Sequence, residues 1–307
     1  MLVAVVLVQT AAMRNPSHLL PLLLLIVPIL WGIYGYIKTR GTNKNKISYP
    51  GTLIINSAML YALAFNIIFF IQELFLALGK RWLGLKAVLY HNNHNWYGKH
   101  PMDDLAQGYG AVAIFITAII CFIIARTMKH STHWLQLFFL WMAFEGFAQS
   151  IPQFITAFMA PDTDTGQAFA YLGLSQTTGL IISISGIILM LLIGCLYSKY
   201  LLQLAPSNSI TENAVSRFGY LSRIALFASI IGVILIIPFR IMPWERASAP
   251  FFVTLLSIPM VFANAWKIKP QQTVNNEVNQ KIVFLPIILL IIVLLIFQLI
   301  LAKGVEM

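Results

Sequence analysis

Apolar runs of nearly membrane-spanning length alternate with short polar segments along the whole chain. A helix needs roughly 20 apolar residues to cross the hydrocarbon core of a bilayer, and about eight runs approach or reach that length. They are Leu19–Ile37, Leu53–Leu78, Gly108–Ala125, Leu135–Met159, Thr178–Tyr197, Ile224–Pro238, Pro250–Trp266 and Ile282–Leu301. The pattern predicts an all-α, polytopic bundle of about eight spans, forming one membrane domain over residues 1–307.

The first 18 residues begin with an apolar segment that is not predicted to span the membrane. Met1–Met13 is too short to cross the bilayer and lacks the basic start of a signal peptide. We expect an interfacial or half-buried helix over residues 1–18. A cleaved leader is the alternative.

Composition supports a membrane location. Hydrophobic residues make up 59% of the 307 residues, charged residues only 10%, and the mean hydropathy is +0.81. A soluble domain carries roughly 25% charged residues, because its surface faces water. The chain is therefore expected in a cell membrane with the lipid bilayer as its partner, and a water-soluble domain of any size is excluded.

The net charge of +10 does not indicate a nucleic-acid partner, because the basic residues are dispersed in short clusters between the apolar runs. Lys and Arg at such positions set topology and contact anionic headgroups. We assume that the first span enters the membrane from outside at Leu19. Twelve of the twenty Lys and Arg residues then fall in one set of loops, which we place in the cytoplasm. The termini, the His91–His94 loop and the Asp162–Asp164 segment then lie outside.

Two carboxylates interrupt the apolar runs. Glu73 follows Asn66 by seven residues, and Glu145 precedes Gln149 by four, so each carboxylate shares a helical face with an amide. A charge in hydrocarbon is costly unless it is paired or hydrated. We expect Glu73 and Glu145 to be acid/base groups facing one another within about 10 Å, given the usual spacing of packed helices. Asn66 and Gln149 are expected to bind a ligand or cofactor, with hydrogen bonding between helices as the alternative.

The connector after the second run holds two closely spaced histidines. His91 and His94 are separated by two residues and accompanied by three asparagines. Their imidazoles could chelate zinc or another divalent metal, with Glu73 or Glu145 completing the shell. A hydrogen-bonded loop whose aromatic residues lie at headgroup level is the alternative. The preceding Arg81–Leu89 mixes basic and apolar residues, which predicts an interfacial helix returning the histidines to the bundle.

The stretch Phe70–Leu78, followed by Trp82-Leu83-Gly84, resembles the zinc helix of site-2-type intramembrane metalloproteases, which carry H-E-x-x-H in an apolar span. The resemblance implies zinc and a general base at Glu73. Gln72 and Leu76 stand at the two histidine positions, which puts that metal in doubt. His91–Trp96 together with Glu145–Gln153 is similar to uncharacterised bacterial multi-pass proteins, which implies no activity.

Two classes of function follow. In both, a polar interior near the outer face binds a small ligand or a metal. The first class is an enzyme diverged from the intramembrane metalloproteases. The second is a non-enzymatic transporter, scaffold or complex subunit, since polar residues in interrupted spans are typical of transporters.

Overall fold

The computed structural model describes residues 26–42, 49–128, 133–240, 244–271, 273 and 281–307, with the backbone alone for 244–249. The segment 1–18 and the start of the first expected span lie outside these residues. The α-helices are α3 (Ile26–Thr39), α4 (Gly51–Trp82), α5 (Asp103–Ala106), α6 (Tyr109–Thr127), α7 (His133–Thr156), α8 (Asp164–Tyr171), α9 (Gln176–Gln203), α10 (Asn208–Glu212), α11 (Ala214–Leu221), α12 (Ala228–Ile236), α13 (Trp244–Phe262) and α14 (Phe284–Leu299). Strands are β1 (Lys86–Leu89), β2 (His94–Tyr97) and β3 (Val305–Glu306).

Five helices in the described part of the chain are long and apolar enough to cross a membrane: Gly51–Trp82, Asp103–Thr127, Gln176–Gln203, Ala214–Phe239 and Phe284–Lys303. A predominantly helical fold with several helices of membrane-spanning length is therefore confirmed, while the described residues show five such helices and do not confirm eight spans. Helix α7 is long, yet its polar side chains lower its hydropathy. The apolar part of α13 is only Pro250–Phe262, and α3 has 14 described residues.

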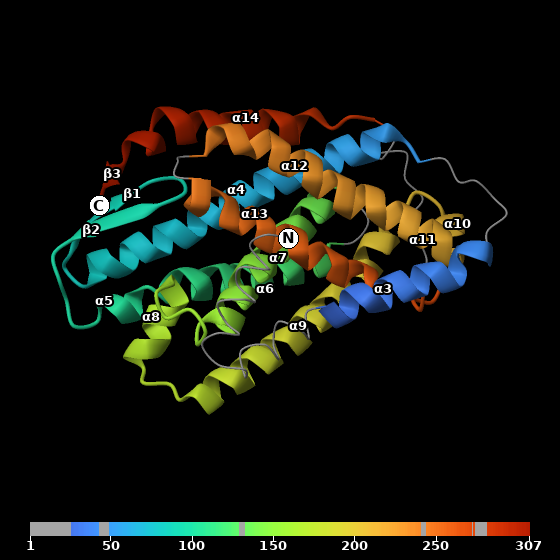
Figure 1. The fold of residues 1–307 in the computed structure, drawn as a ribbon. Helices are drawn as coiled ribbons and strands as arrows, with labels where there is room; N and C mark the ends of the chain where they lie inside the picture. The colour runs from blue at the N-terminus through green and yellow to red at the C-terminus, as the bar shows by residue number, and fades with distance from the viewer. Residues whose placement is uncertain (1–25, 43–48, 129–132, 241–243, 272, 274–280) are drawn as a thin grey trace.

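Helix α4 runs through the centre of the bundle. It packs against α6 and α7 on one side and against α12 and α14 on the other, while α9 lies against α7 and α13 (Figure 1). The apolar part of α4 is 67% buried, against 28% for α14, which runs along the edge of the bundle. Such a central helix is where polar residues can be shielded from lipid.

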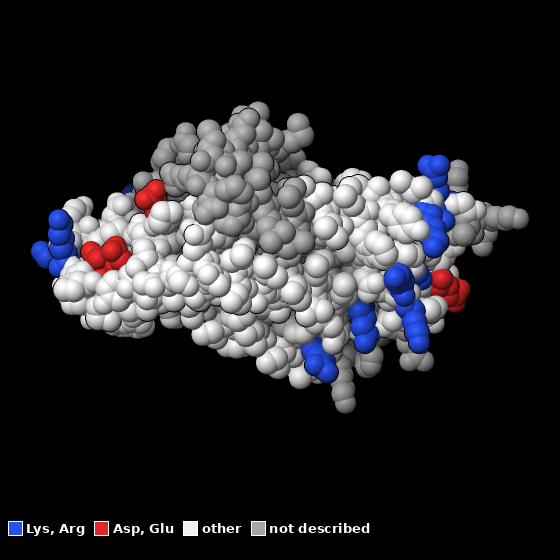
Figure 2. All heavy atoms as spheres, turned by 60° about the horizontal axis from the view of Figure 1, so that its bottom comes forward, with Lys and Arg blue, Asp and Glu red and all other residues white. Residues whose placement is uncertain are grey.

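Charged side chains gather at the two ends of the molecule. In Figure 2, Lys and Arg mark both ends, and the described surface between them is uncharged on the face shown. Exposed Ile and Leu of α9 and α14 contribute to the apolar surface, including Ile181, Ile188 and Leu299. An apolar surface between charged ends is what a bilayer requires.

The interfacial helix expected over Arg81–Leu89 is wrong, although the fold as a whole is predominantly helical, as predicted. Helix α4 ends at Trp82, and a small sheet of order β2-β1-β3 follows. β1 pairs antiparallel with β2, with Leu89 opposite His94, and also with β3 at the C-terminus. Gly84 (φ +78) and Gly98 (φ +102) flank this hairpin in backbone conformations that glycine adopts without steric cost. The alternating exposure of β1 fits a strand rather than a helix.

The hairpin, α5, α8 and the C-terminus lie at one end of the bundle (Figure 1). α5 packs on α8, which begins at Asp164 with Thr163 as its N-cap. The structure therefore places the hairpin and α8 at the same end of the bundle, and the outer side of the membrane stays a prediction for both.

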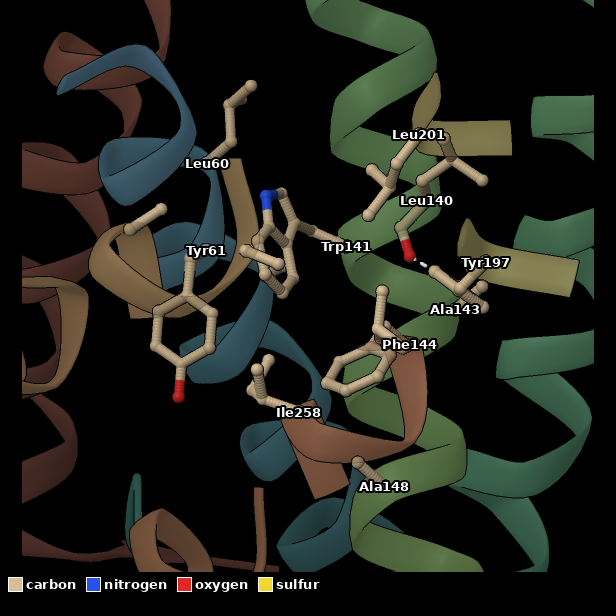
Figure 3. Close-up of a cluster of buried hydrophobic side chains, with 14 of the residues drawn as sticks. Leu60, Tyr61, Leu140, Trp141, Ala143, Phe144, Ala148, Tyr197, Leu201 and Ile258 are labelled. Carbon is tan, nitrogen blue, oxygen red and sulfur yellow. Dashed lines mark hydrogen bonds between the residues drawn. The ribbon is translucent and has the colours of Figure 1, made fainter. Parts of the chain in front are cut away.

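Close helix contacts and buried hydrogen bonds fix the core. Trp141 of α7 donates from its indole Nε1 to the hydroxyl of Ser57 on α4 at 3.0 Å, and Ser57 donates to the carbonyl of Ile224 at 2.6 Å. Ile224 belongs to a π-helical turn, Ser222–Phe227, between α11 and α12. Figure 3 shows Trp141 between Tyr61 of α4 and the side chains of α7 and α9. These contacts tie the irregular turn to two neighbouring helices.

Candidate functional site

One face of α4 carries an aromatic stripe that ends in a carboxylate. Tyr61, Phe65, Phe69 and Glu73 follow one another at intervals of four residues, which places them on one side of the helix. Successive rings stack with centroids 6.2 Å apart. All four side chains are buried. The stripe leads from the middle of the bundle to the hairpin.

The structure brings His94 and Glu73 together. His94 Nδ1 donates to Glu73 Oε2 at 2.8 Å, and both residues are buried. The imidazole also stacks on Trp96, whose other contact is the ammonium group of Lys80, 4.1 Å from the ring centroid. His94 Nε2 has no hydrogen-bond partner among the described residues. The hairpin is thus docked onto α4 through a buried acid–base pair.

The side chain of His91 contacts other residues than His94 does. Its Nε2 donates to the carbonyl of Phe239 at 2.9 Å, and its ring stacks on Phe297 with centroids 5.0 Å apart. Burial, reinforced by the nearby charge of Arg240, lowers the pKa of His91 from 6.5 to about 4. His91 is therefore neutral at physiological pH.

Glu145 lies at the centre of a second polar group. Its Oε2 accepts from Gln149 Nε2 at 2.9 Å and from Thr254 Oγ1 at 3.1 Å, so Gln149 shares its face as the spacing predicted. Glu145 is 0% exposed. Its Oε1 and the Oε1 of Gln149 have no hydrogen-bond partner in the part of the chain that the structure describes.

The polar row on α7 continues to the hairpin end. Gln153 donates to Gln149 O at 2.9 Å and to Gln72 Oε1 on α4 at 3.0 Å, and accepts from Thr165 of α8 at 3.1 Å. Asn66, by contrast, is buried and donates to Ala62 of its own helix. No hydrogen bond joins Asn66 to Glu73, or Glu73 to Glu145, in the described structure. The two carboxylates therefore belong to separate polar groups on neighbouring helices.

Arg240 was missed by sequence reasoning, which counted it among loop cations. It follows the end of α12 and is 6% exposed. Its guanidinium carbon lies 4.9, 4.4 and 5.4 Å from the ring centroids of Phe65, Phe69 and Phe251. The only signal in the sequence is an Arg directly after an apolar run.

The donors present do not fit the zinc that the metalloprotease resemblance implies. A catalytic zinc uses three protein ligands and keeps one open position. Gln72 and Leu76 stand where that family has histidines, and no group of three or more His, Cys, Asp or Glu that could hold a metal occurs among the described residues. His91 and His94 are directed to different partners. The predicted metal shell is therefore not formed in this structure.

Two small cavities lie within the described bundle. Each has a volume of about 10 Å³, room for no more than one water molecule. One is lined by apolar side chains including Trp141, Phe144 and Tyr197, the cluster drawn in Figure 3. Neither cavity is lined by Glu73 or Glu145, and both carboxylates are buried.

Comparison with known proteins identifies no relative: no family model, curated protein or solved structure matches the chain.

Proposed function

We propose that this chain is a non-enzymatic membrane carrier in which Glu145 exchanges a proton as a small polar solute moves through the bundle. The observation that carries the proposal is the setting of Glu145. It is completely buried on α7, with one oxygen held by two donors and the other without a partner among the described residues. Intramembrane ionisable groups of this kind are typical of proton relays.

A buried carboxylate is stabilised by a proton or by a counter-ion, because an unpaired charge in hydrocarbon is costly. Gln149 and Thr254 hold only Oε2. The free Oε1 is the atom at which a proton can be gained and lost without breaking either hydrogen bond. Glu145 is thus positioned as an exchange group rather than as a packing residue.

The two helices that hold Glu145 and Thr254 contain internal prolines, and a nearby span contains an irregular turn, which favours a carrier. Thr254 lies between Pro250 and Pro259 of α13, and α7 contains Pro152. The π-helical turn Ser222–Phe227 interrupts the neighbouring span. Irregular turns are common at functional positions, and interrupted helices form the binding sites of secondary transporters. This geometry supports a carrier over a rigid scaffold.

The enzyme hypothesis has less support, because it needs a metal shell. Its acid/base candidate, Glu73, is already engaged by His94. Metal analysis of the purified full-length protein checks this directly. We expect no stoichiometric zinc or iron. A stoichiometric metal that is lost in both His91→Ala and His94→Ala would favour the metalloenzyme hypothesis over the carrier.

Proteoliposomes containing a pH-sensitive dye test the carrier proposal. A panel of neutral, zwitterionic and anionic small solutes is added outside, and internal pH is followed. We expect at least one solute class to drive proton movement with the wild-type protein and none to do so with Glu145→Gln. Glu212→Gln, at an exposed position, is the matched control and should behave as wild type. The proposal fails if no solute moves protons, or if Glu145→Gln is as active as wild type.

A further inference from the structure

The backbone around Arg240 is held firmly. The carbonyl of Phe239 accepts from His91 of the hairpin and from Gln298 of α14, both at 2.9 Å. Two elements from different parts of the chain therefore fix the residue before Arg240. The arginine side chain is consequently directed inward against α4 and α13 rather than toward a membrane surface.

A second buried arginine shows what a structural role looks like in this protein. Arg217 is 5% exposed, and its Nε, Nη1 and Nη2 donate to the carbonyls of Ala265, Thr211 and Trp266. Arg240 is equally buried, but none of its three nitrogens has a hydrogen-bond partner in the described chain. The difference indicates that Arg240 is not a packing residue of the same kind.

The surrounding rings stabilise the positive charge of the guanidinium but do not accept hydrogen bonds from its N–H groups. Phe65, Phe69 and Phe251 stabilise the positive charge through their π-faces. Phenyl rings cannot accept the in-plane N–H hydrogen bonds of arginine, which carries five such donors. Buried donors without acceptors are costly, and a carboxylate matches the guanidinium edge with two parallel hydrogen bonds.

No described side chain supplies that carboxylate. Oε2 of Glu73 is hydrogen-bonded to His94, and no hydrogen bond joins Glu73 to the guanidinium. Glu145 is engaged by Gln149 and Thr254. The described chain therefore supplies no hydrogen-bond acceptor for Arg240.

We propose that Arg240 binds the carboxylate of a small, water-soluble monocarboxylate with an apolar body. One negative charge balances the single guanidinium, whereas a dianion would leave an excess charge in a low-dielectric interior. The three phenyl rings provide the surface for the apolar body. Because the side chain is enclosed in the described state, the ligand reaches Arg240 when His91 of the hairpin or Gln298 of α14 releases the carbonyl of Phe239. The binding site itself does not depend on the proposed carrier function. Only the identification of this ligand as the transported solute rests on that proposal.

Binding to the full-length protein in detergent tests the proposal without transport. Isothermal titration compares benzoate with benzamide, a neutral molecule of the same shape, and with inorganic phosphate. We expect benzoate alone to bind. Arg240→Gln should weaken binding about tenfold or more, since charged hydrogen bonds are lost. Arg240→Lys keeps the charge but cannot form the bidentate hydrogen bonds of arginine. Its affinity for benzoate should lie between those of wild type and Arg240→Gln.

Arg81→Gln, at an exposed position on the same end of the bundle, is the control and should bind as wild type. If Arg240→Gln does not elute as a folded species, Arg240→Lys alone decides, and unweakened binding would overturn the proposal. So would absence of benzoate binding to wild type, or equal binding of benzamide. Preference for oleate over benzoate by about tenfold or more, equivalent to 1.4 kcal/mol, would overturn the assignment to a water-soluble solute. If benzoate binds but Glu145→Gln still moves protons, the carrier proposal fails and this inference stands.

Discussion

The Nδ1 atom of His94 lies 2.8 Å from Oε2 of Glu73, joining the turn of the hairpin to the central helix. Both side chains are buried, and Lys80 and Trp96 lie directly beside them. This contact holds the hairpin across the end of the aromatic stripe. Loss of either partner leaves a buried polar group without its hydrogen bond.

We therefore expect Glu73→Ala and His94→Ala each to lower stability by about 1–3 kcal/mol, the usual result of leaving a buried polar group unsatisfied. The double variant should lose less than the sum of the two single losses, because the residues are in direct contact. Thermal unfolding in detergent measures this. His100→Ala, at a less buried position, is the control. Fully additive losses would show that the contact does not contribute to stability.

The neutral state of His91 predicts a pH dependence of stability. Its pKa in the folded protein is about 4, below the ordinary 6.5. The unfolded state therefore takes up a proton first, so stability falls as pH drops from about 6.5 to about 4, with no further loss from this group below that range. His91→Gln should flatten this part of the curve of melting temperature against pH. An unchanged slope in His91→Gln would assign the effect to other groups.

The contact between α6 and α7 depends on a glycine. A Cβ atom at Gly146 would lie 2.7 Å from both the carbonyl oxygen of Ile114 and the Cβ of Ala118. Small residues allow such close approach of membrane helices. Gly146→Ala should lower stability by about 1–3 kcal/mol through overpacking. Gly41→Ala, where an added Cβ meets nothing within 4 Å, should have little effect, and equal losses at both positions would contradict this packing.

Topology follows from the pairing of β1 with β3. Val305 lies opposite Leu89, so we expect the C-terminus and the hairpin on one side of the membrane, together with α8 at the same end of the bundle. Single cysteines at Asn95, Asp162 and Glu306, in a chain lacking Cys121 and Cys195, should be labelled from the same side in intact cells. A cysteine at Arg126 should be labelled only from the other side. Opposite labelling of Asn95 and Glu306 would contradict the sheet.

Sequence patterns anticipated the spans because apolar length is a direct requirement of the bilayer. The expected run Leu53–Leu78 falls within α4, and Gln149 lies beside Glu145 because helical spacing fixes its face. The hairpin was not anticipated. Lys86–Leu89 mixes basic and apolar residues as an interfacial helix does, and one partner of that strand lies more than 200 residues away at Val305–Glu306.

The burial of Arg240 could not be predicted from the sequence. Its position after an apolar run fits a membrane-edge cation equally well, and only packing reveals the rings of Phe65 and Phe251 around it. The Glu73–His94 contact was within reach of the sequence, because both residues belong to adjacent segments. The separation of Glu73 from Glu145 into different polar groups was not, because it depends on how α4, α7 and α13 rotate against one another.

Infrared difference spectroscopy on the reconstituted protein tests the role of Glu145 most directly. A step in external pH should produce a difference band in the C=O stretching region of protonated carboxyl groups. We expect that band to disappear in Glu145→Gln and to persist in Glu212→Gln, where the exposed carboxyl group is replaced. A band that is unchanged in Glu145→Gln would show that the buried carboxyl group exchanges no proton, and would contradict the account.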